Sequence, residues 1–160
     1  MATTVVRQTT TVTSSSSSSP VVVSFNTSFL TSIGGLFTVL ELVLGIIVFS
    51  LMYHNGAFQD SKSAFLMLIS FAYWLMCFYF LLSAMLSITG SLLPSTFFFF
   101  LFHAFGFVLY ISGGITVLAV FAKHAFYIPG VIAAGVFALI AAVCHLVHVA
   151  FLYKGSRIQG

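Results

Sequence analysis

Charged residues are scarce in this chain. Its 160 residues include five basic and two acidic side chains, 4% in all, whereas 61% of the residues are hydrophobic. Because soluble globular domains contain about 25% charged residues, this scarcity excludes an ordinary soluble domain. The net charge of +3 is scattered along the chain, so it offers no basic face and we expect no nucleic-acid partner. Cysteine is scarce too, and Cys77 and Cys144 both fall within apolar runs, where a loop disulfide cannot form.

Long apolar runs, in contrast, dominate the sequence. A helix that crosses a bilayer needs about 20 apolar residues. Four runs meet this length, at residues 33–53, 64–88, 97–122 and 129–153. None of them shows the alternation of apolar and polar residues that is typical of barrel strands. The sequence therefore predicts an all-α fold, an integral membrane bundle of four transmembrane helices.

The segments outside these runs are short or polar. Residues 1–28 are rich in serine and threonine, so we expect a disordered N-terminal tail there, without the apolar core of a cleavable signal peptide. Residues 29–155 form the predicted membrane domain, and residues 156–160 a short C-terminal tail. An even number of spans places both ends on one side of the membrane. Lys154 and Arg157, next to the last span, favour the cytosolic side.

One acidic residue, Glu41, lies inside an apolar run. A helix rises about 1.5 Å per residue, so Glu41 lies about 12 Å from the start of the first span. His103, His145 and His148 lie at a similar depth from the same side, on the third and fourth spans. Since an acid in hydrocarbon needs a proton or a partner, we predict an intramembrane polar layer of these four residues. The layer either fixes the packing of the helices or conducts protons or ions, and the presence of a single acid favours the structural role.

The same histidines raise the question of a metal site. His145 and His148 share a helix face, and Cys144 or Glu41 would complete a set of ligand types that zinc uses. No ligand-rich loop accompanies them, so the sequence predicts no metal site and no cofactor. We expect Cys144 to lie deep in the bundle as a small packing residue. No nucleophile–base motif is present, so we expect no catalytic residues and no enzyme.

Small residues recur in the last two spans. Ala134, Ala138 and Ala142 follow one another at a spacing of four, and Gly113 lies in the third span. Small residues at such spacing let two helix backbones approach closely. We therefore expect the third and fourth spans to pack on each other, with a homodimer face as the alternative. The second span is rich in aromatic residues, and we expect it to face lipid.

Three stretches suggest a family. In Thr31–Ser50 (TSIGGLFTVLELVLGIIVFS), an acid follows a leucine-rich stretch and Gly45 follows an apolar triplet. The third span contains His103–Gly113 (HAFGFVLYISG), and the fourth contains Leu146–Phe151 (LVHVAF). Over about residues 25–155, this pattern resembles the MARVEL-domain family, especially its MAL and plasmolipin branch.

The resemblance implies a non-enzymatic membrane organiser, active in vesicle trafficking, membrane apposition, or specialised lipid and junctional domains such as those of myelin. The implied partners are membrane lipids, including raft lipids rich in cholesterol and sphingolipid, and other membrane proteins or further copies of the chain. The implied location is the plasma membrane or trafficking vesicles, with both termini cytosolic. Gly45 is transferred as a helix-packing position. The alternative function is a small transporter or a proton- or ion-conducting channel that uses the polar layer.

Overall fold

The computed structural model describes residues 27–86, 96–121 and 128–158 of the protein. Within them the chain forms four α-helices and one short 3₁₀ helix, and no strand. In chain order the elements are α1 (Ile33–His54), η1 (Ala57–Gln59), α2 (Ser61–Met85), α3 (Phe97–Phe121) and α4 (Pro129–Ile158). Each α-helix contains a segment long and apolar enough to cross a membrane. The predicted all-α fold of a multi-pass membrane protein is confirmed.

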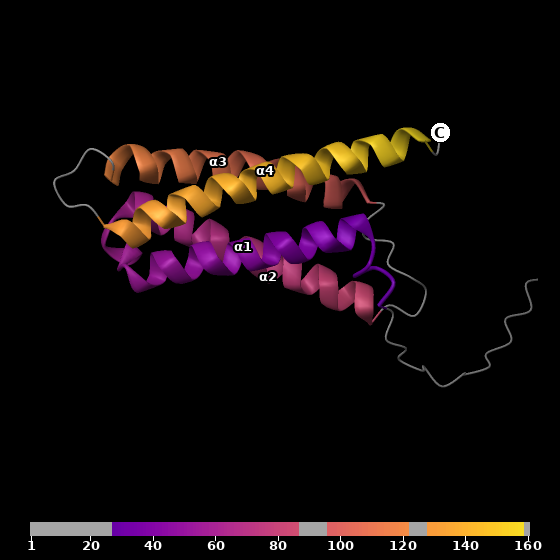
Figure 1. The fold of residues 1–160 in the computed structure, drawn as a ribbon, viewed down its shortest axis with the longest axis horizontal. Coiled ribbons are helices and arrows are strands. Elements are labelled where there is room, and N and C mark those ends of the chain that lie inside the picture. Colours follow the sequence, from indigo (N-terminus) through magenta and orange to yellow (C-terminus); the bar gives the residue numbers. More distant parts are fainter. Residues whose placement is uncertain (1–26, 87–95, 122–127, 159–160) are drawn as a thin grey trace, which may run out of the picture.

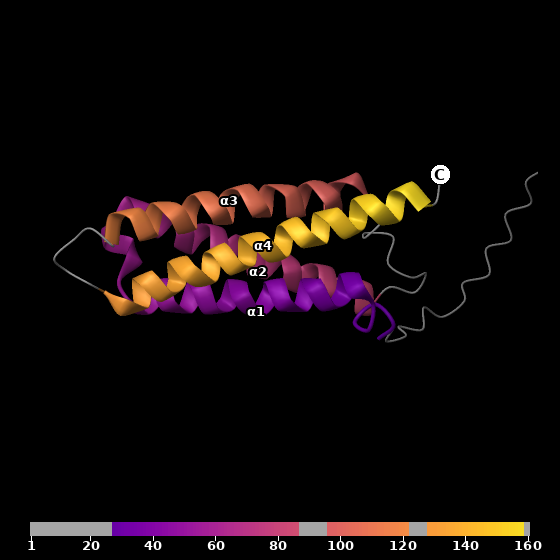
Figure 2. The same ribbon diagram turned by 45° about the horizontal axis from the view of Figure 1, so that its top comes forward.

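The four α-helices run side by side along the long axis of the molecule (Figures 1 and 2). α1 packs against α2 and α4, α4 packs against α3, and α2 also contacts α3. Each helix runs opposite to the one before it, so the start of α1 and the end of α4 lie at the same end of the bundle, at the right in Figure 1. This arrangement places both ends of the membrane domain on one side, as an even number of spans requires.

The helix boundaries differ from the predicted spans at both ends of α2 and at the end of α4. α2 begins at Ser61 rather than at residue 64, because the Asp60 carboxylate caps it by accepting a hydrogen bond from the Ser63 backbone N–H at 3.1 Å. α2 ends at Met85 rather than at residue 88. α4 continues to Ile158, so part of the expected C-terminal tail is helical. Hydropathy marks where a chain leaves the hydrocarbon, and a helix need not stop there.

The expected disorder of the N-terminal tail lies outside the described residues up to residue 26. From residue 27 the chain forms a turn that leads into α1. Ser32 caps α1, since its hydroxyl oxygen accepts a hydrogen bond from the Gly35 N–H at 3.0 Å. A side chain on Gly35 would collide with the carbonyl of Phe29, so glycine lets the turn fold back against the first helical turn.

Small residues bring α3 and α4 close together. A Cβ atom on Gly114 of α3 would lie 3.1 Å from the carbonyl oxygen of Gly135 in α4 and 3.3 Å from the Cβ of Ala138. The three alanines of the predicted stripe, Ala134, Ala138 and Ala142, are all buried within the bundle. Their burial is explained by packing within one chain, so a homodimer face is not needed to account for the stripe.

Two glycines of the predicted packing set serve other contacts. A Cβ on Gly45 of α1 would lie 2.9 Å from the Cβ of Trp74 and 3.2 Å from the hydroxyl oxygen of Tyr110. A Cβ on Gly113 would lie 3.0 Å from Leu66 of α2. Gly45 and Gly113 therefore allow α1 and α3 to approach α2.

The prediction that α2 faces lipid is only half right. Phe71 and Phe78 are exposed on one face, but Tyr73 and Phe80 on the opposite face are buried. The reason is the helical period of 3.6 residues, which distributes a continuous aromatic run around the helix. α2 thus supplies rings both to the surface and to the core.

The expectation for the cysteines is corrected as well. Cys144, expected to lie deep, is only partly buried, whereas Cys77 of α2 is fully buried. Depth along the membrane normal and burial within the bundle are separate properties, and sequence position gives only the first.

Candidate functional site

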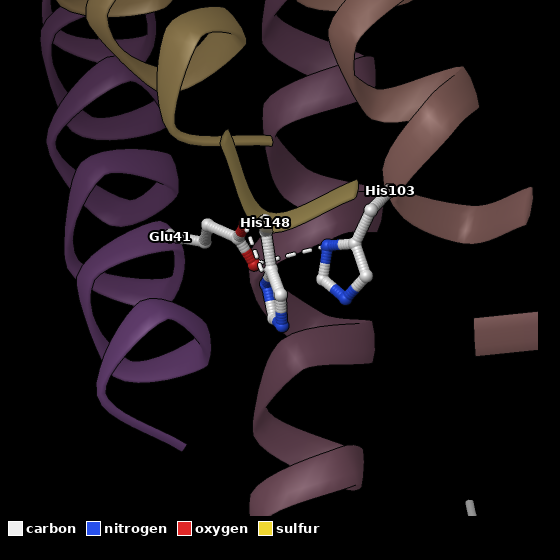
Figure 3. A group of neighbouring side chains, drawn as sticks. All are labelled: Glu41, His103 and His148. Carbon is white, nitrogen blue, oxygen red and sulfur yellow. Dashed lines mark hydrogen bonds and ion pairs between the residues drawn. The ribbon is translucent and has the colours of Figure 1, made fainter. Parts of the chain in front are cut away.

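A buried cluster of one glutamate and three histidines lies inside the bundle. Glu41 comes from α1, His103 from α3, and His145 and His148 from α4; we call these four residues the Glu–His cluster. None of the four is more than 2% exposed. Figure 3 shows His103 and His148 approaching the Glu41 carboxylate from neighbouring helices. The structure therefore brings together all four residues of the predicted polar layer.

All three imidazoles direct the same ring nitrogen at the carboxylate. The Nδ1 atom of His148 lies 3.1 Å from Glu41 Oε1, and the Nδ1 atom of His145 lies 3.2 Å from the same oxygen. The Nδ1 atom of His103 lies 3.2 Å from the other oxygen, Oε2. The contact of His148 has hydrogen-bond geometry, whereas Oε2 of Glu41 makes no hydrogen bond within the described residues.

The histidines also contact one another. The Nδ1 atoms of His103 and His145 are 3.1 Å apart, in hydrogen-bond geometry. Such a bond needs one protonated and one unprotonated nitrogen. The rings of His103 and His148 are in contact, with centroids 3.9 Å apart and an interplanar angle of 38°. The cluster is therefore a mutually connected set, not three independent histidines around one acid.

Aromatic rings surround the cluster. Phe99 of α3 contacts His103 edge-on, with ring centroids 4.5 Å apart, and also contacts His148 at 5.5 Å. Tyr110 stacks on His145 at 5.5 Å with an interplanar angle of 20°. The Nε2 atoms of His103 and His148 are buried and have no hydrogen-bond partner within the described residues. The cluster thus lies in a low-dielectric environment, where charge interactions are strong and unpaired polar groups are costly.

Sequence reasoning missed two residues that shape this site. Tyr73, assigned to the lipid face, instead contacts His145 with ring centroids 5.4 Å apart and donates a hydrogen bond from its hydroxyl to the Phe102 carbonyl at 3.3 Å. Gly106 leaves room for the imidazole of His145, because a Cβ there would lie 2.9 Å from that ring. The available signal was the spacing of three between His103 and Gly106, which places both on one face of α3.

The cluster can perform three kinds of chemistry. Its interhelical contacts can hold α1 to α3 and α4; its connected nitrogens and oxygens can pass a proton; and its donor atoms can bind a cation. For the last possibility, Glu41, His103 and His148 each offer one ligand atom, and these three atoms lie within 4.8 Å of one another. Neither cysteine belongs to this group.

Comparison of the chain with protein-family models gave no match, and neither did comparison with curated proteins or with solved structures. The fold and the site define the class on their own: a multi-pass membrane protein of four helices with a buried Glu–His cluster. The resemblance to the MARVEL-domain family stays a prediction.

Proposed function

We propose that the protein is a non-enzymatic membrane organiser that acts in vesicle trafficking, membrane apposition or specialised lipid and junctional domains. The observation that supports this role best is the apolar outer surface of the bundle. Large hydrophobic side chains are exposed on every helix, for example Leu36 and Val43 on α1, Phe105 on α3 and Val143 on α4. In a bilayer this surface meets lipid tails and the sides of other membrane proteins.

The short connection between the first two helices supports the same proposal. Only residues 55–60 separate α1 from α2, and three of them form η1. Ala57 of η1 is itself buried against the bundle. This connection is too small for a folded adhesion module, so a partner would bind from the side, within the membrane, or would bind the tails in the cytosol. Lipids rich in cholesterol and sphingolipid, other membrane proteins and further copies of the chain are the proposed partners.

In the proposed function, the Glu–His cluster stabilises the packing of the helices on one another. It joins α1 to α3 and to α4 through one carboxylate. Interhelical polar contacts of this kind stabilise membrane bundles, since lipid offers no competing hydrogen bonds. A rigid bundle presents a constant outer surface to the surrounding lipids and membrane proteins. A protein that organises these neighbours in the plane of the membrane needs such a surface.

The test is the location of a tagged full-length chain in polarised epithelial cells, with fractionation of detergent-resistant membranes. We expect enrichment at an apical or junctional domain and in the resistant fraction. Replacing Leu36 and Val43 on the outer face of α1 by alanine should reduce that enrichment without unfolding the bundle. The matched control is Met52→Leu, a volume-conserving change in the core of the same helix. Uniform distribution of the unaltered chain would contradict the proposal.

The second candidate function is proton or ion conduction. It is favoured by the contacts that link His103 to His145 and His148 to Glu41, each at 3.1 Å, because a linked set of titratable groups is what a proton relay uses. Purified protein in liposomes should then pass protons down a gradient, and Glu41→Gln should abolish the flux. The absence of flux at every pH tested would remove this candidate and leave the organiser proposal intact.

A further inference from the structure

We propose that the Glu–His cluster binds one divalent transition-metal ion, with zinc as the expected ion. The ligands are the carboxylate of Glu41 and the imidazole nitrogens of His103 and His148, whose donor atoms lie within 4.8 Å of one another, and the Nδ1 atom of His145 lies 3.2 Å from the same carboxylate. The sequence, in contrast, predicts no metal site, because no ligand-rich loop accompanies these residues. The proposed site is independent of the organiser function, because a metal site would hold the helices together whatever the bundle does.

The spacing of the donor atoms fits a metal centre. Zinc lies about 2.0–2.1 Å from imidazole nitrogen and carboxylate oxygen, so tetrahedral ligand atoms are about 3.3 Å apart. The contacts of the cluster are close to this value: His103 Nδ1 lies 3.2 Å from Glu41 Oε2, and His148 Nδ1 lies 3.1 Å from the other carboxylate oxygen, Oε1. The Nδ1 atoms of His103 and His145 are 3.1 Å apart. Donors from three helices thus already lie at nearly the spacing that one ion needs.

Hydrogen bonds alone explain this convergence poorly. With Glu41 ionised, its oxygens only accept, so His103 and His145 would each need a proton on Nδ1 to bond to it. Two protonated nitrogens cannot then bond to each other, yet these two lie 3.1 Å apart. If one of them is unprotonated, it faces the carboxylate with a lone pair. A cation among the donor atoms would satisfy every lone pair at once.

A second observation also points to a ligand. Oε2 of Glu41 is buried and makes no hydrogen bond within the described residues, although the Nδ1 atom of His103 lies 3.2 Å from it. A buried carboxylate oxygen without a hydrogen bond is costly, and coordination of a cation would remove that cost. The donor set also selects the ion: imidazole suits zinc, copper, iron and nickel, whereas calcium and magnesium prefer sites made of oxygen ligands.

The experiment measures metal in the full chain purified in detergent from cells grown with added zinc. We expect one zinc ion per chain by mass spectrometry. His103→Ala and His148→Ala should each reduce the zinc content to background. The control is His54→Ala at the exposed end of α1, which should retain the full content. Retention of zinc by both cluster variants, or its loss from the His54 variant alone, would overturn the proposal.

X-ray absorption at the zinc edge needs no variant, so a folding defect cannot obscure it. We expect nitrogen and oxygen ligands at about 2.0–2.1 Å and the outer-shell pattern of imidazole. Sulfur ligands at about 2.3 Å would place the ion on a cysteine and overturn the proposal. Zinc-grown protein without metal above background would overturn it as well. Neither result bears on the location experiment, so failure of the metal site and failure of the organiser function are distinguishable.

Discussion

Replacing Glu41 by alanine should destabilise the bundle. The carboxylate contacts three histidines, at 3.1, 3.2 and 3.2 Å. Polar contacts between membrane helices contribute about 0.6 kcal/mol each on average, so loss of three costs about 2 kcal/mol. The void left by the side chain adds to this cost, and so does the loss of any bound ion. Glu41→Gln, which keeps the shape and one acceptor oxygen, should cost less than Glu41→Ala.

The assay is reversible unfolding of the purified chain in bicelles, with the free energy of unfolding measured by steric trapping. The matched control is Leu40→Ala, on the neighbouring residue of the same helix. Leu40 is 44% exposed on the outer face, whereas Glu41 is 2% exposed. Since surface substitutions usually change stability by less than about 0.5 kcal/mol, Leu40→Ala should have little effect. A Glu41→Ala variant as stable as the Leu40→Ala variant would show that the contacts of Glu41 with the histidines do not stabilise the bundle.

Three further substitutions test helix packing and capping by the same assay. Ala138→Leu should lower the free energy of unfolding by about 1–3 kcal/mol, because it inserts three carbons where α3 and α4 are close. The control, Ile140→Leu on the exposed face of α4, should change it little. Equal effects of the two variants would contradict the α3–α4 interface. Asp60→Ala should cost about 1 kcal/mol by removing the cap of α2, and an unchanged unfolding free energy would mean that α2 begins elsewhere. Gly106→Ala should cost about 1–3 kcal/mol, because the added methyl group would press on His145; a stable variant with unchanged histidine resonances would show that the ring lies elsewhere.

The number and approximate length of the helices were predictable because crossing a bilayer requires a fixed length of apolar chain. α1 was predicted to within one residue at its end. The start of α2 at Ser61 and the continuation of α4 to Ile158 were missed because a helix can extend beyond the hydrocarbon. The end of α2 was also wrong, since the helix ends at Met85, before the predicted residue 88. Capping by Asp60 was visible in the sequence, as a DSKS segment before an apolar run, but hydropathy does not register it.

The depth of the cluster was predictable for a similar reason, since helix rise and span order determine which residues share a level. The rotation of each helix about its own axis could not be predicted from the sequence. In a membrane protein both the core and the lipid face are apolar, so the sequence has little periodic contrast to show which side faces inward. This is why Tyr73 was assigned to lipid and why Cys144 was expected to be deeper than it is.

The sequence also could not show which ring nitrogen of each histidine faces Glu41. Spacing placed His145 and His148 near Glu41, but only the packing of α4 on α1 and α3 directs both Nδ1 atoms to one carboxylate. This difference separates two chemical interpretations. Histidines at one depth suggest a polar layer, whereas three convergent nitrogens suggest a bound cation.

The feature on which the site depends is the placement of Glu41 among histidines inside the bundle and not against lipid. Solid-state nuclear magnetic resonance on the full chain in lipid bilayers tests it most directly, through the correlation between the carboxyl carbon of Glu41 and the side-chain nitrogens of histidine. Because His148 Nδ1 lies 3.1 Å from Glu41 Oε1, we expect a strong cross-peak that disappears in Glu41→Gln when only glutamate and histidine are labelled. Correlation of Glu41 with lipid acyl chains, and none with histidine, would contradict it.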